Sequence, residues 1–460
     1  MNDTVDAIIV GAGPAGLAAA AELAKHRLSV CLLDEQIGPG GQIWRNTNPV
    51  HQWPGVIYSP ASTVIDICAQ ETISVTWLQH SPTEKVMRQT HARALIIATG
   101  AMERPLLFPG VQLPGVMGIG AMQCVLKQAR LVPRGPGVVL AGHGPLLLLT
   151  AKQIMEQGAS IDAVLDLSIP GARKNAAKCL PGAVIADPSL LIQGIQLIRS
   201  LRRMGIRVWK NVTALEASGD GLIKQVQFVA DSCQQRLPAR LLAVHDGVLA
   251  NTQLTRLLNL EHYWNEAQQS FVPLTHANGQ SSHPQVWIAG DGAGVVGVDL
   301  AVQRGRLAGL AVAQALKPSP THKAKQSNSV KMKLLERGIR RRLPARLFID
   351  TLYPPLPIDH LATADTIVCR CEAITLGTIR SAIAQGAVGP NRVKTFTRCG
   401  MGACQGRQCS TQLTRIVAQE TGKPAGVVGA LRIRPPLKPT LIADYLSLAL
   451  TNTPDVGTNA

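Results

Sequence analysis

Aromatic and acidic side chains are both scarce in this sequence of 460 residues. Phe, Trp and Tyr make up 3% of it, and 46 basic residues outnumber 29 acidic ones, which gives a formal net charge of +17. A basic chain invites a nucleic-acid interpretation, but single-strand binders stack bases on aromatic rings, and few rings are present. We therefore expect no nucleic-acid partner. Much of the charge lies in residues 323–346, which we interpret as a solvated linker, with an acidic partner subunit or an anionic membrane surface as alternatives.

Long apolar runs are also missing. No stretch reaches the roughly 18 consecutive apolar residues of a transmembrane helix. Asp3 and Asp6 stand where a signal peptide would be basic. The length is sufficient for about three domains with buried cores. These features predict a cytoplasmic protein, with peripheral attachment to the inner membrane left open.

The motif C-x-x-C is absent, which argues against a disulfide reductase, because Cys124 then has no neighbour with which to form a redox pair. Ten cysteines are nevertheless present, and half of them gather near the C-terminus. In a reducing compartment such a group binds metal or performs redox chemistry more often than it forms disulfides. The clustered cysteines are Cys369, Cys371, Cys399, Cys404 and Cys409.

The N-terminal segment has the pattern of a dinucleotide-binding unit. An apolar run, "VDAIIV" (5–10), ends at "GAGPAG" and is followed by residues of strong helix propensity. The three glycines serve the tight turn, the approach of a pyrophosphate and the packing of helix on strand. A second strand ends at Asp34, placed to accept hydrogen bonds from an adenosine ribose, and Glu35 could do the same if the strand runs one residue longer. The predicted binding residues here are Gly11, Gly13, Pro14, Ala15, Gly16, Asp34 and Glu35.

Three further stretches narrow the choice of dinucleotide. They are "GPGGQIWR" (38–45), "ALIIATGAMERP" (94–105) and "QVWIAGDGAG" (285–294), the last two being strands that enter glycine turns. In this order they resemble the motifs of two-dinucleotide-domain flavoproteins, which implies a Rossmann-like α/β fold that binds FAD. The acid that matches Asp291 binds the ribityl chain in that family. The resemblance adds Gly40, Gly41, Gln42, Thr99, Gly100, Gly290 and Asp291 to the predicted site.

A second nucleotide-like unit occupies residues 135–168. It repeats strand, glycine turn, helix and strand, with Gly142 and Gly144 in the first two glycine positions. Leu147 replaces the third glycine, so its side chain should crowd the helix against the strand. Asp166 could still meet a ribose. Binding of NAD(P) or ATP and a retained scaffold without ligand both stay open.

His245 and Asp246 are adjacent in the return toward the FAD domain. Neighbours on a strand face opposite ways, which is not the geometry of a catalytic pair. We interpret both as structural, and the sequence predicts no catalytic residue.

The clustered cysteines have the spacing of a metal site. A C-x-C pair and a C-x4-C pair, with 32 residues between them, offer four sulfur ligands from two loops, which suits zinc or an iron-sulfur cluster. Arg370, Arg398 and Arg407 adjoin these positions and would stabilise thiolates. Because a flavin in the same chain gives a reason for a one-electron carrier, we favour [2Fe-2S].

Three stretches around these cysteines carry a more specific resemblance. "CRCE", "VKTFTRCGMGACQGRQC" and "RIRPPLKPT" are similar to the BFD-like [2Fe-2S] domain that ends the α subunits of flavoprotein amine dehydrogenases, among them opine oxidase, D-hydroxyproline dehydrogenase and hydrogen cyanide synthase. The resemblance implies Cys369, Cys371, Cys404 and Cys409 as cluster ligands and Cys399 as a fifth, non-ligating thiol. The spacing of Cys399 to Cys404 equals that of Cys404 to Cys409, so an exchange of roles stays open.

The resemblance also implies a function. In such complexes a β subunit with its own FAD oxidises an amine, and the α subunit receives the electrons. FMN at the subunit interface, FAD and the cluster are expected to pass them to an acceptor such as a quinone, and a small ferredoxin-like γ subunit can be present. The alternatives are a self-sufficient NAD(P)H-dependent reductase and a metal-handling module without flavin.

The expected architecture is a Rossmann-like two-dinucleotide-domain flavoprotein with a small helical BFD-like iron-sulfur domain. The predicted segments are an FAD domain (1–110 and 245–318), an inserted nucleotide-binding-like domain (111–244), a basic linker (319–362), the [2Fe-2S] domain (363–425) and a proline-containing tail (426–460).

Overall fold

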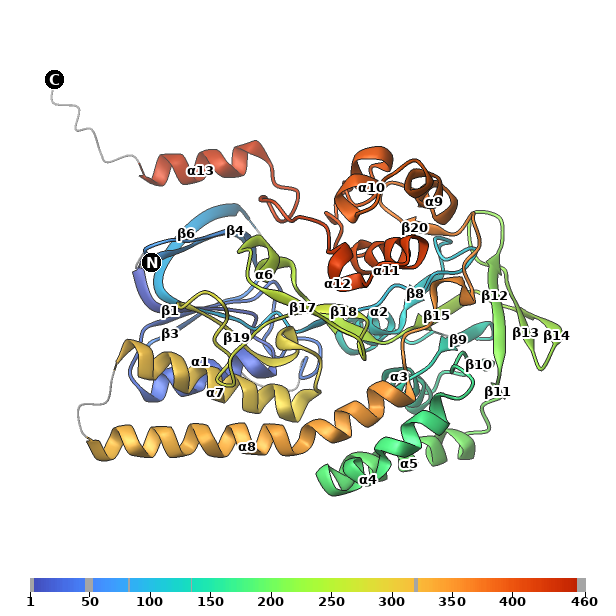
Figure 1. Cartoon of the computed structure of the whole chain (residues 1–460), viewed down its shortest axis with the longest axis horizontal. Helices are drawn as coiled ribbons and strands as arrows, with labels where there is room; N and C mark the ends of the chain where they lie inside the picture. Colours follow the sequence, from blue (N-terminus) through green and yellow to red (C-terminus); the bar gives the residue numbers. More distant parts are fainter. Residues whose placement is uncertain (1–3, 46–52, 82, 134, 318–321, 453–460) are drawn as a thin grey trace.

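The computed structural model describes residues 4–45, 53–81, 83–133, 135–317 and 322–452 (Figure 1). The parts of the predicted FAD domain, inserted domain, linker and tail that fall on residues 1–3, 46–52, 82, 134, 318–321 and 453–460 lie outside this description.

The first sheet contains seven strands in the order β3-β2-β1-β6-β5-β4, with β19 paired to β6. Strands β1, β2, β3, β19 and the second half of β6 are parallel, whereas β4 and β5 form an antiparallel extension. Because β19 joins the sheet from far along the chain, this domain is built from two separate segments. The strands are β1 (Thr4–Val10), β2 (Val30–Leu33), β3 (Val56–Ser59), β4 (Ser62–Ala69), β5 (Ile73–His80), β6 (Lys85–Ile97) and β19 (Val286–Ile288).

Two helices, α1 (Pro14–Lys25) and α7 (Val298–Leu316), cover one face of this sheet. They pack at backbone contact, since a Cβ on Gly305 would lie 2.1 Å from the carbonyl oxygen of Ala15. The opposite face buries an apolar core around Trp77 that includes Ile433 and Leu437 from near the end of the chain. The shorter elements beside this domain are α6 (Gln253–Leu257), β17 (His262–Asn265), β18 (Ser270–Pro273) and the 3-10 turn η2 (Gly290–Ala293).

The second domain contains an all-parallel sheet in the order β11-β10-β9-β15-β8. Strand β9, a glycine turn and helix α3 repeat the arrangement of β1 and α1, as the sequence predicts. A pair of short antiparallel strands, β7 (Ala101–Glu103) and β16 (Val248–Ala250), carries the chain between the two domains. The parallel strands are β8 (Val116–Gly118), β9 (Val138–Gly142), β10 (Ala163–Asp166), β11 (Val208–Trp209) and β15 (Leu241–His245).

Helices and one antiparallel sheet complete the second domain. They are α2 (Ile119–Cys124), the π-helical turn η1 (Val125–Ala129), α3 (Pro145–Glu156), α4 (Ala172–Ala186), α5 (Pro188–Arg203), β12 (Val212–Ser218), β13 (Gln225–Ala230) and β14 (Cys233–Pro238).

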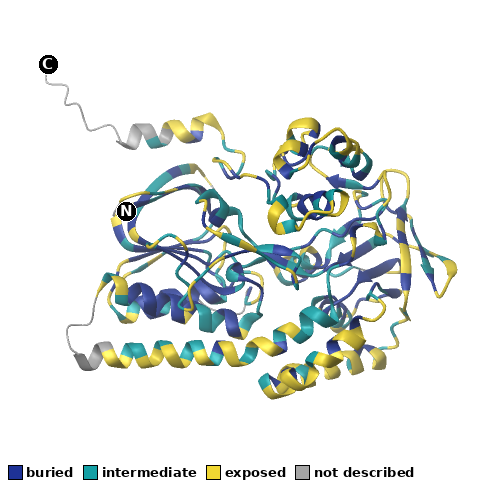
Figure 2. Cartoon of the chain, viewed as in Figure 1, coloured by how far each residue is buried: buried dark blue, intermediate teal, exposed yellow. Residues whose placement is uncertain are grey.

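The basic stretch expected to be a linker forms a single helix, α8 (His322–Leu352), which runs along α7 and α4 (Figure 1). Most of its described surface faces solvent (Figure 2). Arg342 and Arg346 pair with the largely buried carboxylates of Asp187 and Asp350. Strong helix formers such as Lys, Arg and Leu keep the segment helical.

The five clustered cysteines near the C-terminus lie in a small helical domain with its own apolar core. Its elements are η3 (Ile358–His360), β20 (Ile367–Cys369), β21 (Ile374–Thr375), α9 (Leu376–Ala384), α10 (Pro390–Thr397), α11 (Ser410–Thr421) and α12 (Ala425–Val428). After α12 the chain returns to the first domain, where α13 (Ile442–Asn452) lies along β6.

A buried carboxylate, that of Asp246, joins these parts. Its Oδ1 accepts hydrogen bonds from His143 Nε2 at 3.2 Å and from the Leu356 backbone N–H at 2.9 Å. Arg104 Nε lies 3.8 Å from Oδ2. Burial raises the pKa of Asp246, but the hydrogen bond from His143 and the charges of Arg104 and Arg415 outweigh burial, so the net shift of the pKa is downward. The carboxylate thus stays ionised.

The neighbouring His245 has a different partner. Its Nδ1 is 3.0 Å from Glu103 Oε1, whereas Asp246, the residue after β15, binds His143 and Leu356. The two side chains therefore do not face each other, as expected for neighbours on a strand.

Among the described helices, none alone has the length and hydropathy of a membrane span. The bent pair α4 and α5, at 118° to each other, passes the same test of length and composition only as a pair.

His262, on β17, generates a test of the fold. Its Nδ1 donates to the Leu260 carbonyl oxygen at 2.7 Å, and its Nε2 lies 2.9 Å from the Thr255 hydroxyl oxygen. Burial, followed by the charge of Arg256, lowers the pKa of His262 from 6.5 to about 4. Between those pH values the unfolded chain binds more protons than the folded chain, so stability falls as pH falls, by up to roughly 3 kcal/mol.

We expect the thermal unfolding midpoint of His262→Gln to fall less between pH 7 and pH 4.5 than that of the wild type. Substitution of the exposed His276 by Gln serves as the control and should keep the wild-type slope. Equal slopes for wild type and His262→Gln would contradict this account.

Candidate cofactor sites

The predicted glycine turns converge at the carboxyl ends of the parallel strands of the first sheet. Gly11 follows β1 with φ of 106°, and a Cβ there would lie 2.4 Å from the Ala98 carbonyl oxygen. A Cβ on Gly16 would lie 1.8 Å from the Gly11 carbonyl oxygen. Only glycine lets β1, β6 and α1 approach this closely. This edge of a parallel sheet is where nucleotides bind in such folds.

Gly13 differs from its neighbours because it faces open space. A Cβ there would meet no atom within 4 Å. Gly13 also caps the N-terminus of α1, where Pro14 and Ala15 begin the helix and backbone N–H groups lack intrahelical partners. Gly41 closes one side, since its Cβ would lie 3.0 Å from Gly13 Cα, and the Gly40 N–H donates to the Ala12 carbonyl at 2.8 Å. Backbone donors at a helix N-terminus, with room before them, fit a pyrophosphate.

The two acids after β2 have separate roles. Asp34 is buried and turned inward, where its carboxylate accepts the backbone N–H of Ala12 at 2.5 Å and that of Gln36 at 2.7 Å. Burial raises the pKa of Asp34, and these two hydrogen bonds partly offset the rise. Glu35 is half exposed and forms an ion pair with Lys438 of the C-terminal tail. Asp34 therefore fixes the glycine loop, and Glu35 is the acid that faces outward.

The remaining predicted residues lie at the neighbouring strand ends. Gly100, whose φ is 66°, follows β6 beside Thr99, and a Cβ on Gly292 would lie 3.8 Å from its backbone. Asp291 Oδ1 accepts the backbone N–H of Val296 at 2.8 Å and that of Gly297 at 3.2 Å, just before α7. Gln42 binds across to the second domain, where its Oε1 accepts from the Cys124 thiol at 2.8 Å.

Sequence reasoning missed Arg304. Its guanidinium is buried and Nη1 donates to the carbonyl oxygens of Gly290, Ala293 and Gly294 at 2.7–3.1 Å. Burial lowers the pKa of Arg304, and the charge of Asp291 opposes the shift. The residue organises the whole GDGAG turn from within α7. The sequence offers no distinct signal for it, because α7 also contains Arg306 and the partners of Arg304 are backbone carbonyl oxygens.

The second nucleotide-like turn is more closed. Leu147 is buried between α3 and the sheet, in the core that also contains Ile154 and Leu140. His143, between the two glycines, points into the buried cluster around Asp246, and its ring stacks on Tyr353 with 6.0 Å between centroids. Asp166 ends β10 and lies 3.7 Å from Arg173. Arg173 of α4 and Tyr353, which follows α8, thus occupy the surroundings of this turn.

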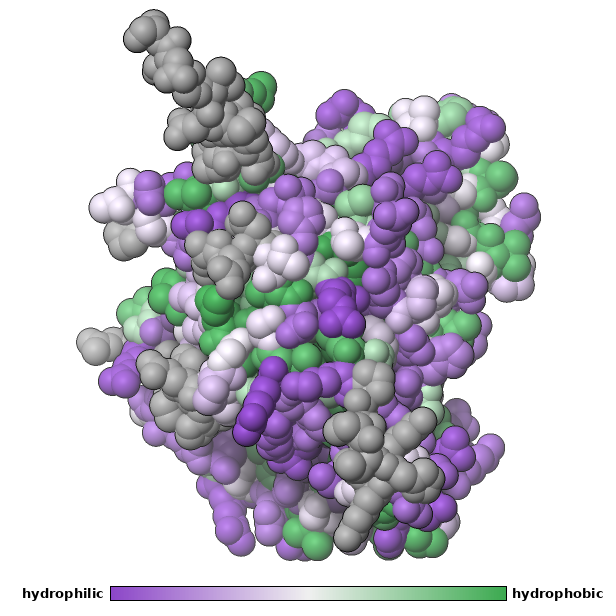
Figure 3. All heavy atoms as spheres, turned by 90° about the vertical axis from the view of Figure 1, so that its left-hand side faces the viewer, coloured by the Kyte–Doolittle hydropathy of each residue, from purple (hydrophilic) through white to green (hydrophobic). Residues whose placement is uncertain are grey.

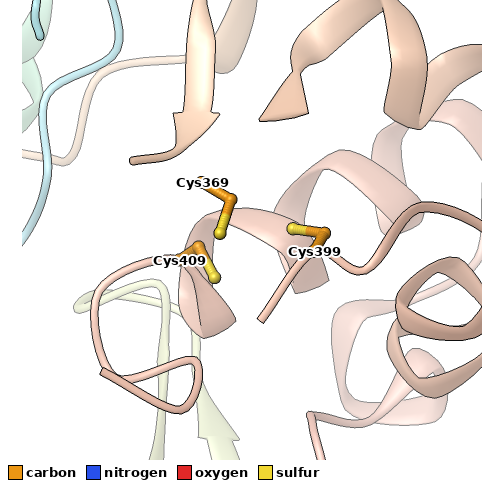
Figure 4. Close-up of side chains that lie close together, drawn as sticks. All are labelled: Cys369, Cys399 and Cys409. Carbon is orange, nitrogen blue, oxygen red and sulfur yellow. The ribbon is translucent and has the colours of Figure 1, made fainter. Parts of the chain in front are cut away.

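All five clustered cysteines lie close together in the small domain. The Sγ atoms of Cys369, Cys399 and Cys409 lie within 4.8 Å of one another, and all three residues are buried. Figure 4 shows their side chains pointing toward a common centre from β20, the loop after α10 and the start of α11. Cys371 and Cys404 form a second group, in which the Cys404 backbone and thiol both hydrogen-bond to Cys371.

Hydrogen bonds among the three buried thiols shift their pKa values in opposite directions. Hydrogen bonds from Cys399 and then Cys409 lower the pKa of Cys369 to about 2. The hydrogen bond with Cys369 in turn raises the pKa of Cys399 to about 12 and that of Cys409 further. The loop passes close to the ligands because Gly402 has no side chain: a Cβ there would lie 2.2 Å from Cys371 Cβ. Thiolate donors from two loops suit a soft metal or an iron-sulfur cluster.

Comparison with known proteins agrees with both sites. The family model described as FAD dependent oxidoreductase matches residues 6–263, and that of the BFD-like [2Fe-2S] binding domain matches residues 367–419. The A-type subunit of opine oxidase from Rhizobium meliloti (strain 1021) is 36% identical over 96% of this chain and 98% of its own length. The chain belongs to the family of FAD-dependent oxidoreductases that includes this opine oxidase subunit.

Two further relatives extend the comparison of this family member. Hydrogen cyanide synthase subunit HcnB of Pseudomonas aeruginosa is 30% identical over 96% of this chain and 98% of its own length. The crystal structure of L-proline dehydrogenase from P. horikoshii has a TM-score of 0.69 at 18% identity, covering 96% of this chain and 79% of that one, which shows a shared fold.

These findings confirm the predicted fold class and the choice of FAD and a [2Fe-2S] cluster as cofactors. The individual binding residues stay predictions, as does the division of the five cysteines into four ligands and one bystander. Both of these relatives are named as subunits, one of opine oxidase and one of hydrogen cyanide synthase.

The cysteine geometry generates a prediction about the ligand set. Alanine at Cys369, Cys371, Cys404 or Cys409 should each abolish the visible absorption of the two-iron cluster after anaerobic reconstitution, because a ligand is lost. Alanine at Cys399 should keep it, with iron and sulfide content near wild type. Loss of the cluster in Cys399→Ala, together with retention in Cys404→Ala, would reverse the roles of these two residues.

Proposed function

We propose that this chain is the electron-transferring α subunit of a heteromeric dehydrogenase that oxidises an opine or D-hydroxyproline type of secondary amine. The observation that carries the proposal is that one chain contains both the glycine turns of an FAD site and a site of five thiols for the cluster. The two domains are joined through buried contacts at Asp246. Full-length similarity to a chain named as an opine oxidase subunit supports the substrate class.

In this proposal, residues of this chain bind the two cofactors. The N-terminus of α1 with Gly13 and Gly41 would bind the pyrophosphate of FAD, Glu35 the adenosine ribose, and Asp291 the ribityl chain. Cys369, Cys371, Cys404 and Cys409 would hold the cluster. FAD accepts two electrons together and releases them singly, and a [2Fe-2S] cluster carries one at a time, so the pair converts between these two modes.

The electron donor in the proposal is a separate β subunit that carries its own FAD and the amine site, with FMN at the interface. A small ferredoxin-like γ subunit can complete the complex, and a quinone is the proposed acceptor. The relatives' designations as subunits support partners of this kind.

A self-sufficient NAD(P)H reductase is the competing function, and the second nucleotide-like turn speaks against it. Leu147 fills the position where a glycine would let the helix approach the strand, and it is buried there. His143 is held by Asp246 and stacked on Tyr353 instead of facing a ligand. We interpret this domain as a scaffold that keeps the fold of a nucleotide site.

Stopped-flow spectroscopy separates the two functions. Under anaerobic conditions, NADH should leave the flavin absorbance of the purified chain unchanged over many seconds. In the complex purified from the native host, an opine or D-hydroxyproline substrate should bleach the flavin absorbance within the time of one catalytic turnover. Rapid bleaching of the isolated chain by NADH would overturn the proposal.

The proposed quinone acceptor suggests contact with a membrane, and α4 and α5 offer a surface for it. Six basic residues lie between positions 172 and 203 against one acid, Asp187, which is paired with Arg342. Exposed aliphatic side chains accompany them, a combination typical of helices that lie on anionic bilayers (Figure 2). They are Leu180, Val184, Ile185, Leu190, Ile192, Ile195 and Ile198.

Vesicle sedimentation tests this surface. The chain should bind vesicles of phosphatidylcholine with phosphatidylglycerol and not vesicles of phosphatidylcholine alone. The double change Ile192→Asp and Ile195→Asp should weaken binding at least about tenfold, because burial of two aliphatic groups is lost. Leu222→Asp, an exposed position between β12 and β13, is the matched control. Binding unaffected by lipid charge or by the double change would refute the membrane contact.

A further inference from the structure

The tail that follows the cluster domain connects the cores of two domains within seven residues. Leu431 is buried against the cluster loop, where its Cδ1 lies 2.6 Å from the position of a Cβ on Gly400 and 2.7 Å from one on Gly406. Ile433 and Leu437 are then buried in the apolar core of the FAD-domain sheet. The segment 431–437 therefore belongs to both cores at once.

Hydrogen bonds fix the tail at the same two places. Gln405, in the cluster loop between Cys404 and Gly406, donates from Nε2 to the Pro436 carbonyl oxygen at 2.7 Å. One residue further on, the Leu437 N–H donates to the Ile65 carbonyl oxygen of β4 at 2.9 Å. Beyond it α13 lies on β6, with Leu448 packed against the small core of Ile65, Leu78 and Met87. The tail is thus fastened before and after the next residue, Lys438.

Lys438 is held against Glu35. Its side chain is 24% exposed, that of Glu35 is 53% exposed, and the two form an ion pair. Burial lowers the pKa of Lys438. One Asp34 oxygen accepts from Ala12 of the glycine loop and the other from the backbone of Gln36, so Glu35 is the outward-facing carboxylate at the end of β2 that can meet an adenosine ribose.

Apolar side chains flank this ion pair along the chain. Ile37, two residues after Glu35, is 78% exposed, and Leu441 and Ile442, which follow Lys438 closely, are 64% and 82% exposed. Figure 3, which views the end of the molecule formed by the FAD domain, shows hydrophobic side chains gathered in the middle of that face. An adenine ring needs apolar contact on its faces and a hydrogen-bonding group at its ribose, and the two chain segments that meet at this ion pair carry side chains of both kinds.

We propose that the tail residues 433–442 form the outer wall of the adenosine end of the FAD site, with Lys438 as a positioning residue for Glu35. The inference rests on the proposed role of Glu35 in FAD binding. FAD can leave only when the tail lifts, and lifting it breaks the bond between Gln405 and Pro436 beside the cluster ligands. Retention of FAD is thereby coupled to the docking of the cluster domain.

The rate of FAD release measures the contribution of Lys438. The full-length chain reconstituted with FAD and iron is diluted, and flavin fluorescence reports release. Lys438→Ala should release FAD roughly three- to fivefold faster, since a partly exposed ion pair is lost. Lys438→Arg should restore slow FAD release. The double variant Glu35→Lys with Lys438→Glu should release FAD faster than Lys438→Arg, because the ribose then faces a lysine in place of a carboxylate. Lys423→Ala, an exposed lysine of the cluster domain, is the matched control.

Hydrogen exchange provides a second readout that does not depend on a single side chain. Residues 433–446 of the chain without FAD should exchange several times faster than those of the FAD-loaded chain, whereas α9 should exchange alike in both. If the wild type retains no FAD on reconstitution, the proposed FAD site itself fails. The tail inference alone fails if the wild type retains FAD, Lys438→Ala releases FAD at the wild-type rate, and hydrogen exchange of residues 433–446 is the same with and without FAD.

Discussion

The buried carboxylate of Asp246 is the constraint on which the arrangement of domains depends. It stands at the return from the inserted domain and binds His143 of the second glycine turn and the backbone of Leu356 at the entry to the cluster domain. Arg104, beside the first crossing between domains, and Arg415 of α11 supply positive charge. Removal of one partner from a buried charge typically lowers the folding stability by about 3–5 kcal/mol. Displacement of any one of these segments would therefore leave the Asp246 carboxylate without one of its partners. The network thus connects the inserted domain, the return toward the FAD domain and the cluster domain.

The glycine-rich turns could be predicted from the sequence because their chemistry is local. A strand, a turn with φ above zero and a helix lie within about twenty residues, and the close approaches at Gly11 and Gly16 admit no side chain. Which of Asp34 and Glu35 faces outward could not be predicted, because a shift of one residue in the end of β2 exchanges the directions of the two side chains. Arg304 was also missed, because its partners are carbonyl oxygens, which carry no sequence signature.

Longer-range features were harder to predict for a related reason. A basic stretch with little apolar periodicity gives no sign of being a single long helix, and α8 is positioned by the faces of α7 and α4 that it covers. The five cysteines were predicted to gather because of their spacing. Which of them face one another depends on how the loop turns at Gly400 and Gly402, so the closeness of Cys399 to Cys369 and Cys409 emerges only in three dimensions.

The pairing of β19 with β6 has a consequence for biosynthesis. These two strands are separated in the chain by the whole inserted domain, and Asp291 and α7 follow the later one. A ribosome therefore releases a finished inserted domain before the first sheet can close, since domains fold as units when they emerge. The nascent N-terminal half presents its glycine turn and an open sheet edge until residue 316 has left the exit tunnel. A chain interrupted before that point would lack Asp291 and α7, and with them one side of the predicted FAD site.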